Sequence, residues 1–218
     1  MKFPRIILIA LLCCACGAQA GELPKTLFEM VGVKSEPGKL SNSVLVIIDA
    51  QREYVDGALP LVGVSEAIAE IGKLVTRARK SGTPVVHVVH RGKGTLFNPG
   101  SSGFEIVAAL QPLPNEAVVE KMRTSAFAET GLEKVIQRSG RRSLIIAGFM
   151  THNCVSSTAR AARDLGYVPT VVASATATRD LPDGRNGVIA ASVLQASSLA
   201  ALADRTATVV PAQQDISD

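Results

Sequence analysis

The 218-residue sequence is poor in aromatic and charged residues. Aromatic residues make up 4% of it, tryptophan is absent, and charged residues account for 19%. Proteins that bind nucleic acid through their surface present clusters of lysine and arginine, and the sequence contains no such cluster. Beyond the N-terminus, no segment is apolar over the roughly 20 residues that a membrane-spanning helix requires. We therefore expect no nucleic-acid partner and no stable membrane span in the mature chain.

The first twenty residues have the composition of a secretory signal peptide. Lys2 and Arg5 precede an apolar stretch that ends near Cys16, and residues 18–20 are the small-residue sequence Ala-Gln-Ala. Cleavage before Gly21 removes two positive charges and no acidic residue, so the formal net charge falls from +4 to +2. We expect a periplasmic or secreted protein, and a lipid anchor on Cys16 is a weaker alternative.

Cysteine is also scarce in the mature chain. Cys13, Cys14 and Cys16 lie within the predicted signal peptide, which leaves Cys154 alone. In an oxidising compartment cysteines are normally paired, so a single thiol indicates intermolecular pairing, burial as a small apolar side chain, or chemical reactivity. The cysteine count by itself does not decide among these three.

Short β-branched apolar runs alternate with longer helical patterns from residue 43 onward. Strands are predicted over residues 44–49, 84–90, 116–121, 143–149, 168–175 and 207–210. Helices are predicted over residues 64–82, 102–111, 127–140, 154–166 and 186–202. This alternation predicts a three-layer α/β/α sandwich with a mostly parallel six-stranded sheet. We expect an irregular N-terminal lead-in over residues 21–42 and a single domain over residues 43–212.

Three reactive side chains fall at the carboxyl ends of predicted strands, which is where open parallel sheets bind ligands. They are Asp49, Lys121 and Cys154. Singly, each has an ordinary structural explanation, but together they predict a site. A thiol at a helix N-terminus beside a lysine is expected to have a lowered pKa. Asp49 would then take the thiol proton and later activate water.

The segments around these residues resemble the isochorismatase-like cysteine hydrolases. They are VIIDAQREYVDGALPL around Asp49, VVEKMRTSAF around Lys121 and GFMTHNCVSSTARAARDLGY around Cys154. The superfamily includes nicotinamidases, carbamoylsarcosine and ureidoacrylate amidohydrolases, and isochorismatase, and the resemblance covers residues 43–210. It implies that Asp49, Lys121 and Cys154 form a catalytic triad. It also implies a cis peptide at Phe149-Met150 and an oxyanion hole made by the amides of Met150 and Cys154.

The activity that this resemblance implies is hydrolysis of a small amide or ureide. The Cys154 sulfur would attack the carbonyl, and water activated by Asp49 would hydrolyse the thioester. Three alternatives stay open: a vinyl-ether hydrolase of the isochorismatase type, a silent binding module on the same fold, and a thiol redox protein. The last is disfavoured because the mature chain has no second cysteine to resolve an oxidised thiol.

The sequence departs from the metal-binding members of the superfamily. Nicotinamidases hold a divalent metal through an Asp-x-His pair and further histidines after the second strand, where this chain reads VVHVVHRGKGTLFNPG. His87 and His90 are three residues apart on a predicted strand and face opposite sides, which is poor geometry for joint ligation. We expect no metal and no cofactor, with His87 packed in the core and His90 lining the pocket.

Further candidates follow from position along the chain. The residues expected to contact a small-molecule substrate are Gln51, Tyr54, His90, Phe127, His152 and Asn153. Tyr54 and Phe127 would sandwich a flat substrate. Residues 178–180 are assigned a structural or subunit-contact role. The apolar stretch over residues 188–203 predicts a homo-oligomer, because it can bury one face on the sheet and part of another on a partner.

Overall fold

The computed structural model describes residues 23–218, so the predicted signal peptide lies outside the described part of the chain. Six strands form one fully parallel sheet in the order β3-β2-β1-β4-β5-β8. Their bounds are β1 Ser43–Ile48, β2 Val85–His90, β3 Ala117–Lys121, β4 Ser143–Phe149, β5 Val168–Ala177 and β8 Thr208–Val210. The six-stranded parallel sheet of the sequence analysis is thereby confirmed.

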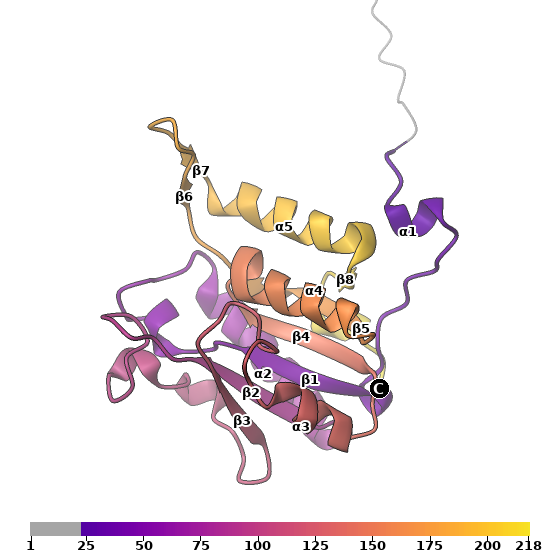
Figure 1. The fold of residues 1–218 in the computed structure, drawn as a ribbon, viewed down its shortest axis with the longest axis horizontal. Helices are drawn as coiled ribbons and strands as arrows, with labels where there is room; N and C mark the ends of the chain where they lie inside the picture. The colour runs from indigo at the N-terminus through magenta and orange to yellow at the C-terminus, as the bar shows by residue number, and fades with distance from the viewer. Residues whose placement is uncertain (1–22) are drawn as a thin grey trace, which may run out of the picture.

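Helices cover both faces of the sheet (Figure 1). One face carries α2 (Val64–Lys80), and the other carries α3 (Leu132–Arg138), α4 (Ser156–Asp164) and α5 (Ala191–Arg205). Every residue of β1 is buried, and its side chains alternate between the two apolar cores. Continuous apolar runs are expected in a parallel sheet because neither face meets water.

The helix α2 illustrates how the apolar spacing fixes the packing. Ile71, Leu74 and Ala78 recur at intervals of three and four residues, and all are fully buried against the sheet. Burial of each large aliphatic side chain contributes roughly 1.5–3 kcal/mol. The helix stops before Gly82, whose φ of +65° lies in the left-handed region that glycine adopts without strain.

Three predicted helices differ from the structure. The helix predicted over 127–140 covers only Leu132–Arg138, because turns occupy residues 127–131. The segment predicted as a helix over 102–111 instead forms two short 3₁₀ turns, Ser102–Phe104 and Ala108–Leu110. Its backbone pairs with the loop after β1, through the Gln51–Ile106 bridge, and these extended contacts compete with helix formation. The last helix begins at Ala191 because a small hairpin precedes it, formed by β6 (Leu181–Pro182) and β7 (Val188–Ile189).

The segment that leads into the sheet lies along α5 and β8. It contains the four-residue helix α1 (Leu27–Met30), which Thr26 and Glu29 close with a reciprocal capping box. Phe28 is buried there, and the Arg163 guanidinium lies 5.0 Å from its ring centre. Within residues 23–218, none of the helices combines the length and apolar character needed to cross a membrane.

Candidate active site

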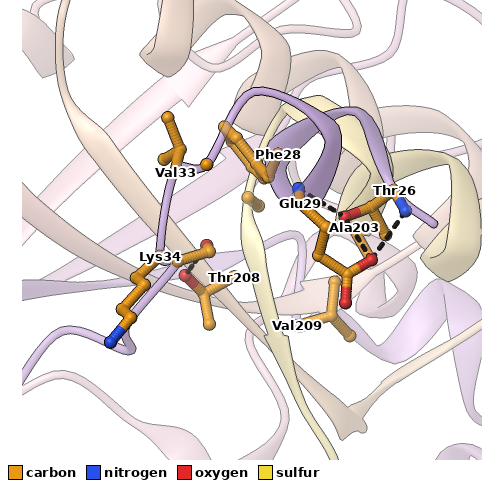
Figure 2. A pocket seen from close by; sticks show the side chains of 11 residues that line it. Thr26, Phe28, Glu29, Val33, Lys34, Ala203, Thr208 and Val209 are labelled. Atoms are coloured by element: carbon orange, nitrogen blue, oxygen red, sulfur yellow. Dashed lines mark hydrogen bonds between the residues drawn. The ribbon is translucent and has the colours of Figure 1, made fainter.

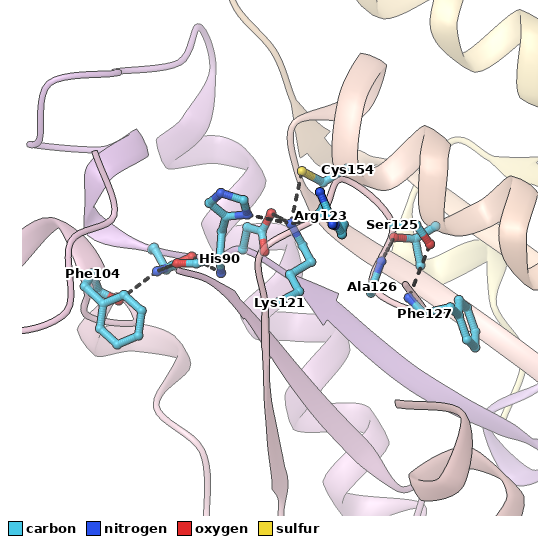
Figure 3. A network of polar contacts seen from close by, with 11 residues as sticks. His90, Phe104, Lys121, Arg123, Ser125, Ala126, Phe127 and Cys154 are labelled. Carbon is cyan, nitrogen blue, oxygen red and sulfur yellow. Dashed lines mark hydrogen bonds and ion pairs between the residues drawn. The ribbon is translucent and has the colours of Figure 1, made fainter. Parts of the chain in front are cut away.

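The side chains of Asp49, Lys121 and Cys154 meet at the carboxyl edge of the sheet. Asp49 follows β1, Lys121 is the last residue of β3, and Cys154 follows β4. The Lys121 Nζ lies 2.8 Å from Asp49 Oδ2 and donates to Cys154 Sγ at 3.2 Å (Figure 3). The three residues are between 0% and 4% exposed. A buried ammonium group therefore bridges a carboxyl group and a thiol.

The backbone at Asp49 turns sharply so that its carboxyl group enters this cluster. Its φ is +50°, a left-handed conformation that aspartate tolerates better than most residues. Its amide donates to Val88 O at 2.9 Å, which anchors the turn to β2. Oδ1 has no hydrogen-bond partner within the part of the chain that the structure describes. One oxygen of this buried carboxyl group is thus available to accept a proton.

Gly148 lets β4 approach β1 next to Asp49. It pairs with Ile48, and a Cβ at this position would lie 2.0 Å from the Ile48 carbonyl oxygen. Its φ of +116° is also one that other residues rarely adopt. The sequence analysis did not single out Gly148, although a glycine inside an apolar strand often marks a close backbone approach.

The loop that carries Cys154 has an unusual backbone. The peptide between Phe149 and Met150 is cis, as the family resemblance implies. A single π-helical turn, Thr151–Val155, follows and runs directly into α4. Turns of this kind occur mostly as local insertions at functional sites. The Thr151 hydroxyl donates to Ala177 O at 3.1 Å, which ties the loop to the end of β5.

The structure corrects the expected state of the thiol. Burial raises the pKa of Cys154 to about 12, and the negative charge of Asp49 acts in the same direction. Lys121 lowers this pKa but does not outweigh burial. A helix N-terminus and a neighbouring lysine predicted a lowered pKa, and the sequence could not show how completely the thiol is shielded from water. Cys154 is therefore a neutral thiol at pH 7 in the ligand-free protein.

The surroundings of Asp49 make its carboxyl group a stronger base than an ordinary aspartate. Burial raises the pKa of its carboxyl group, opposed by the charge of Lys121 and by hydrogen bonds from Lys121 and Cys154. The carboxyl group and the thiol thus lie within hydrogen-bonding reach of each other. A carboxyl group with a raised pKa accepts a proton more readily than an ordinary aspartate and can return it.

His90 extends the cluster toward solvent. The Lys121 ammonium lies 3.1 Å from His90 Nδ1, and because an ammonium group can only donate, Nδ1 must accept. Burial and the charge of Lys121 lower the pKa of His90 to about 4, so the ring is neutral at pH 7 and carries its proton on Nε2. The half-buried ring lines a cavity of about 300 Å³ together with Arg91, Gly92, Lys93, Met122 and Arg123. Asp49, Lys121 and Cys154 do not line this cavity, so the substrate contact expected of His90 stays a prediction.

Gln51 is placed differently from the other substrate-binding candidates. It is fully buried, and its amide nitrogen donates to the carbonyl oxygens of His90 and Phe104 at 3.0 and 2.9 Å. Its amide oxygen accepts from His90 N at 2.8 Å. Both amide protons are consumed in joining the loops, so Gln51 offers a substrate no donor.

The two aromatic candidates do not face each other. Tyr54 is buried in edge contacts with Phe97 and Phe149, at centroid distances of 5.0 and 5.9 Å. Phe127 stacks on Tyr167 at 5.8 Å, in the core on the opposite face of the sheet. The predicted sandwich of a flat substrate between Tyr54 and Phe127 is therefore wrong. The reason is the side of the sheet on which each ring packs, which sequence position did not reveal.

The loop residues His152 and Asn153 lie beside the thiol and are half-buried. His152 Nδ1 lies 2.5 Å from Thr178 Oγ1, which ties the nucleophile loop to the segment after β5. Burial lowers the pKa of His152, and the charge of Arg179 acts in the same direction. The Asn153 side chain makes no hydrogen bond within residues 23–218, and its expected contact with substrate stays a prediction.

His87 belongs to a separate cluster. Its Nε2 lies 3.0 Å from Glu116 Oε2, and burial lowers the pKa of the ring. Among the described residues, no three histidine, cysteine or acidic side chains gather in a way that could hold a metal ion.

A cavity of about 650 Å³ is lined by none of the candidate site residues. It lies between the N-terminal segment and the α5–β8 connection, where Phe28 and Lys34 face Thr208 and Val209 (Figure 2). No buried ionisable cluster lines it, so cavity size does not locate the chemistry in this protein.

Comparisons with known proteins agree with this architecture. A family model described as the isochorismatase domain matches residues 43–214. The secreted isochorismatase effector Isc1 of Verticillium dahliae is 37% identical over 183 residues, covering 83% of this chain and 94% of that protein. The ureidoacrylate amidohydrolase RutB of Pseudomonas syringae is 29% identical over 181 residues, covering 66% of this chain and 73% of that protein.

A solved structure is also similar over nearly the whole fold. The crystal structure of an isochorismatase from Pseudomonas putida KT2440 matches with a TM-score of 0.85 and 42% identity. The match covers 89% of this chain and 100% of that one. The domain match and the shared fold together establish that this chain belongs to the isochorismatase family of hydrolases.

Proposed function

We propose that the protein is a cysteine hydrolase that cleaves the C–N bond of a small amide or ureide through a thioester on Cys154. The observation that carries the proposal is the position of the Lys121 ammonium, 2.8 Å from Asp49 and 3.2 Å from Cys154 in a buried site. The name of the relative RutB, an amidohydrolase, supports the substrate class.

The first step is activation of the thiol. Because the pKa of Cys154 is raised to about 12, the sulfur needs a base at the moment of attack. Asp49 lies within reach and takes the proton while the sulfur bonds to the substrate carbonyl carbon. The Lys121 Nζ, in contact with both groups, holds the carboxyl group and the sulfur in place during this step. The substrate oxygen becomes an oxyanion, which the amides of Met150 and Cys154 bind.

The second step releases the amine. The tetrahedral intermediate collapses, the C–N bond breaks, and protonated Asp49 gives its proton to the leaving nitrogen. A thioester on Cys154 remains. Water then loses a proton to Asp49 and attacks the thioester carbonyl, and the thiolate leaves and recovers that proton. The net reaction consumes one amide and one water and releases one acid and one amine.

Intact-mass spectrometry tests this proposal. The mature protein is quenched in acid within seconds of mixing with a panel of small amides, ureides and activated esters. We expect an acyl adduct on wild-type protein, none on Cys154→Ala, and one that forms much more slowly on Asp49→Asn. Turnover of a vinyl ether without any acyl adduct would contradict the thioester mechanism and favour the isochorismatase reaction.

We propose that the protein is exported after cleavage near Ala20. The composition of residues 1–20 supports this, as does the relative named a secreted effector. The full chain expressed in a bacterial host is expected to yield a periplasmic or extracellular protein that begins at Gly21. A cytoplasmic protein that keeps Met1 would contradict export.

We propose that α5 and the preceding hairpin contact a second copy of the chain. Of the fifteen residues of α5, which are mostly apolar, Ala191 and Leu202 are buried. Val188 and Val193 are 70% and 57% exposed. Light scattering at micromolar concentration is expected to give a dimer or larger assembly, which Val193→Lys weakens. A monomeric wild type would contradict this proposal.

A further inference from the structure

Lys121 has more hydrogen-bond acceptors around it than it has protons to donate. Its Nζ lies 2.8 Å from Asp49 Oδ2 and 3.2 Å from Cys154 Sγ. The same atom lies 3.2 Å from the Arg123 carbonyl oxygen and 3.1 Å from His90 Nδ1 (Figure 3). An ammonium group carries three protons, so these four acceptors compete for them. An acceptor that takes one proton therefore weakens the hydrogen bond that Lys121 can make to another.

His90 supplies the one acceptor of this set that is a side-chain atom outside the proposed reacting groups. Asp49 and Cys154 take part in the proposed reaction, and the Arg123 acceptor is a backbone carbonyl oxygen. The His90 ring is neutral at pH 7, because burial and the charge of Lys121 lower its pKa to about 4. Nδ1 therefore keeps its lone pair for Lys121.

The position of the His90 ring is fixed from two sides. The Gln51 side-chain amide holds the backbone of His90, by accepting from its N–H at 2.8 Å and donating to its carbonyl oxygen at 3.0 Å. The buried ring of Phe97 meets the imidazole edge-on, with the centroids 5.3 Å apart. Nδ1 is thus aimed at Lys121 before any substrate enters, as a residue that orients a catalytic group must be.

We infer that His90 is a positioning residue, which accepts one Lys121 proton and so keeps the Asp49 carboxylate free to act as the base. Without this acceptor, more of the donor capacity of Lys121 turns to Asp49 Oδ2, 2.8 Å away. A stronger hydrogen bond to a carboxylate favours its charged form and lowers its pKa. Asp49 would then take the thiol proton less readily. The inference rests on the proposed hydrolase function and adds a residue that tunes its base.

The other groups that face Asp49 stay neutral while it titrates. Cys154 on the nucleophile loop and Tyr54 on the turn after β1 both have a pKa that burial and the charge of Asp49 raise. Neither loses its proton in the acidic or neutral range. The charged group that faces Asp49 from β3 is Lys121, and Lys121 is the group that His90 contacts.

His90→Leu and His90→Asn form a matched pair of variants. Leucine branches as the imidazole does but offers no acceptor, whereas asparagine places Oδ1 where Nδ1 lies. Both variants lose the ring contact with Phe97 and the titration of the imidazole, so the acceptor distinguishes them. We expect the Asp49 titration midpoint to lie about one pH unit lower in His90→Leu than in wild type, and close to wild type in His90→Asn.

Carbon-13 NMR of labelled aspartate carboxyl groups measures this midpoint without any substrate. The Asp49 signal is the one that Asp49→Asn removes. His87→Gln serves as a control, because it replaces the other histidine of β2, which contacts Glu116, and should leave the midpoint unchanged. Equal midpoints in His90→Leu and His90→Asn overturn the inference, as does the same displacement in His87→Gln. His90→Val, which also lacks an acceptor, replaces His90→Leu should the latter not fold.

Initial rates separate this inference from the proposed function. The kcat of His90→Leu should fall about tenfold or more at pH 7 with little change in KM, and His90→Asn should recover most of the loss. The acid limb of kcat in His90→Leu should move to lower pH together with the NMR midpoint.

Three other outcomes decide between the two ideas. A lowered Asp49 midpoint in His90→Leu, without hydrolysis of any probe by wild type, supports the positioning role and counts against the proposed function. Hydrolysis with the same kcat and pH profile in both His90 variants supports the hydrolase and overturns the positioning role. A loss that falls on KM equally in both variants also overturns it, because that result identifies His90 as a substrate contact.

Discussion

Two buried carboxyl groups near the ends of β3 are held in opposite ways. Glu116 lies just before the strand and accepts hydrogen bonds from two nitrogens of Arg79, from His87 and from the Leu113 amide. Burial alone would raise its pKa, but these bonds outweigh burial and lower the pKa of Glu116 to about 2. This carboxylate is fixed in its charged form.

Asp49 faces Lys121 at the other end of β3. There the effect of burial on the pKa of Asp49 is larger than the opposing effect of Lys121. Its pKa is raised, although an ammonium group lies 2.8 Å away, and its Oδ1 has no partner within the described residues. The comparison teaches that the depth of burial and the number of donors together decide the state of a carboxyl group, and that one nearby cation does not offset complete burial. Glu116 is suited to hold structure together, whereas Asp49 is suited to exchange a proton.

Replacing each carboxyl group by the amide of the same size should separate the catalytic role of Asp49 from the structural role of Glu116 most sharply. Asp49→Asn is expected to reduce kcat by about 10³-fold or more, as for other nucleophilic catalytic units. Glu116→Gln should leave kcat within about twofold, because it touches neither the thiol nor Lys121. Initial rates on the best substrate of the amide and ureide panel provide the measurement. Equal losses in both variants would mean that Glu116 also supports the chemistry.

The rate at which Cys154 is alkylated reports the pKa of its thiol. With a pKa of about 12, the thiol should react with iodoacetamide more than about tenfold slower than a free cysteine at pH 7.5. Its rate should rise about tenfold per pH unit up to pH 11. Asp49→Asn should speed labelling at a fixed pH, because the Asp49 charge raises the thiol pKa. Mass spectrometry at successive times gives the rates, and a plateau near pH 9 would refute the raised pKa.

The hydrogen bonds of Glu116 should contribute to the stability of the protein. Glu116→Gln is expected to lower the free energy of unfolding by about 1–3 kcal/mol at pH 7, since it weakens hydrogen bonds to a buried charged group. The ordinary pKa is 4.5 and the folded value about 2, so this contribution is complete above pH 4.5 and is lost as the pH falls toward 2. Urea unfolding of both proteins across this range checks the sign. Parallel curves for wild type and variant would contradict it.

An exposed arginine–glutamate pair gives the smallest expected effect. Arg123 and Glu129 lie 2.9 Å apart, yet their side chains are 62% and 64% exposed, so solvent screens the pair. Arg123→Gln is expected to produce no measurable change in Tm, in contrast to Glu116→Gln. A loss as large as that of Glu116→Gln would show that burial is not what distinguishes the two pairs.

Much of the fold could be predicted because each element has a local signal. The runs 44–48 and 144–149 contain no polar side chain, as in strands buried on both faces, and α2 repeats its apolar residues with helical spacing. The segment 102–111 could not be predicted, because its backbone is recruited by the loop after β1. Phe127 was misplaced because the face on which a side chain after a strand packs depends on tertiary contacts.

The sequence by itself determined a parallel sheet and the edge at which Asp49, Lys121 and Cys154 converge, since the common direction of the strands follows from the alternating pattern. The order of the strands came only from the structure. Only the tertiary structure decided what these groups do. Shielding of the thiol and the missing donor at Asp49 Oδ1 each depend on residues brought together from several elements. Desolvation and hydrogen bonding depend on all the residues that surround a group. Those residues come from distant parts of the chain, so no local stretch of sequence reveals them.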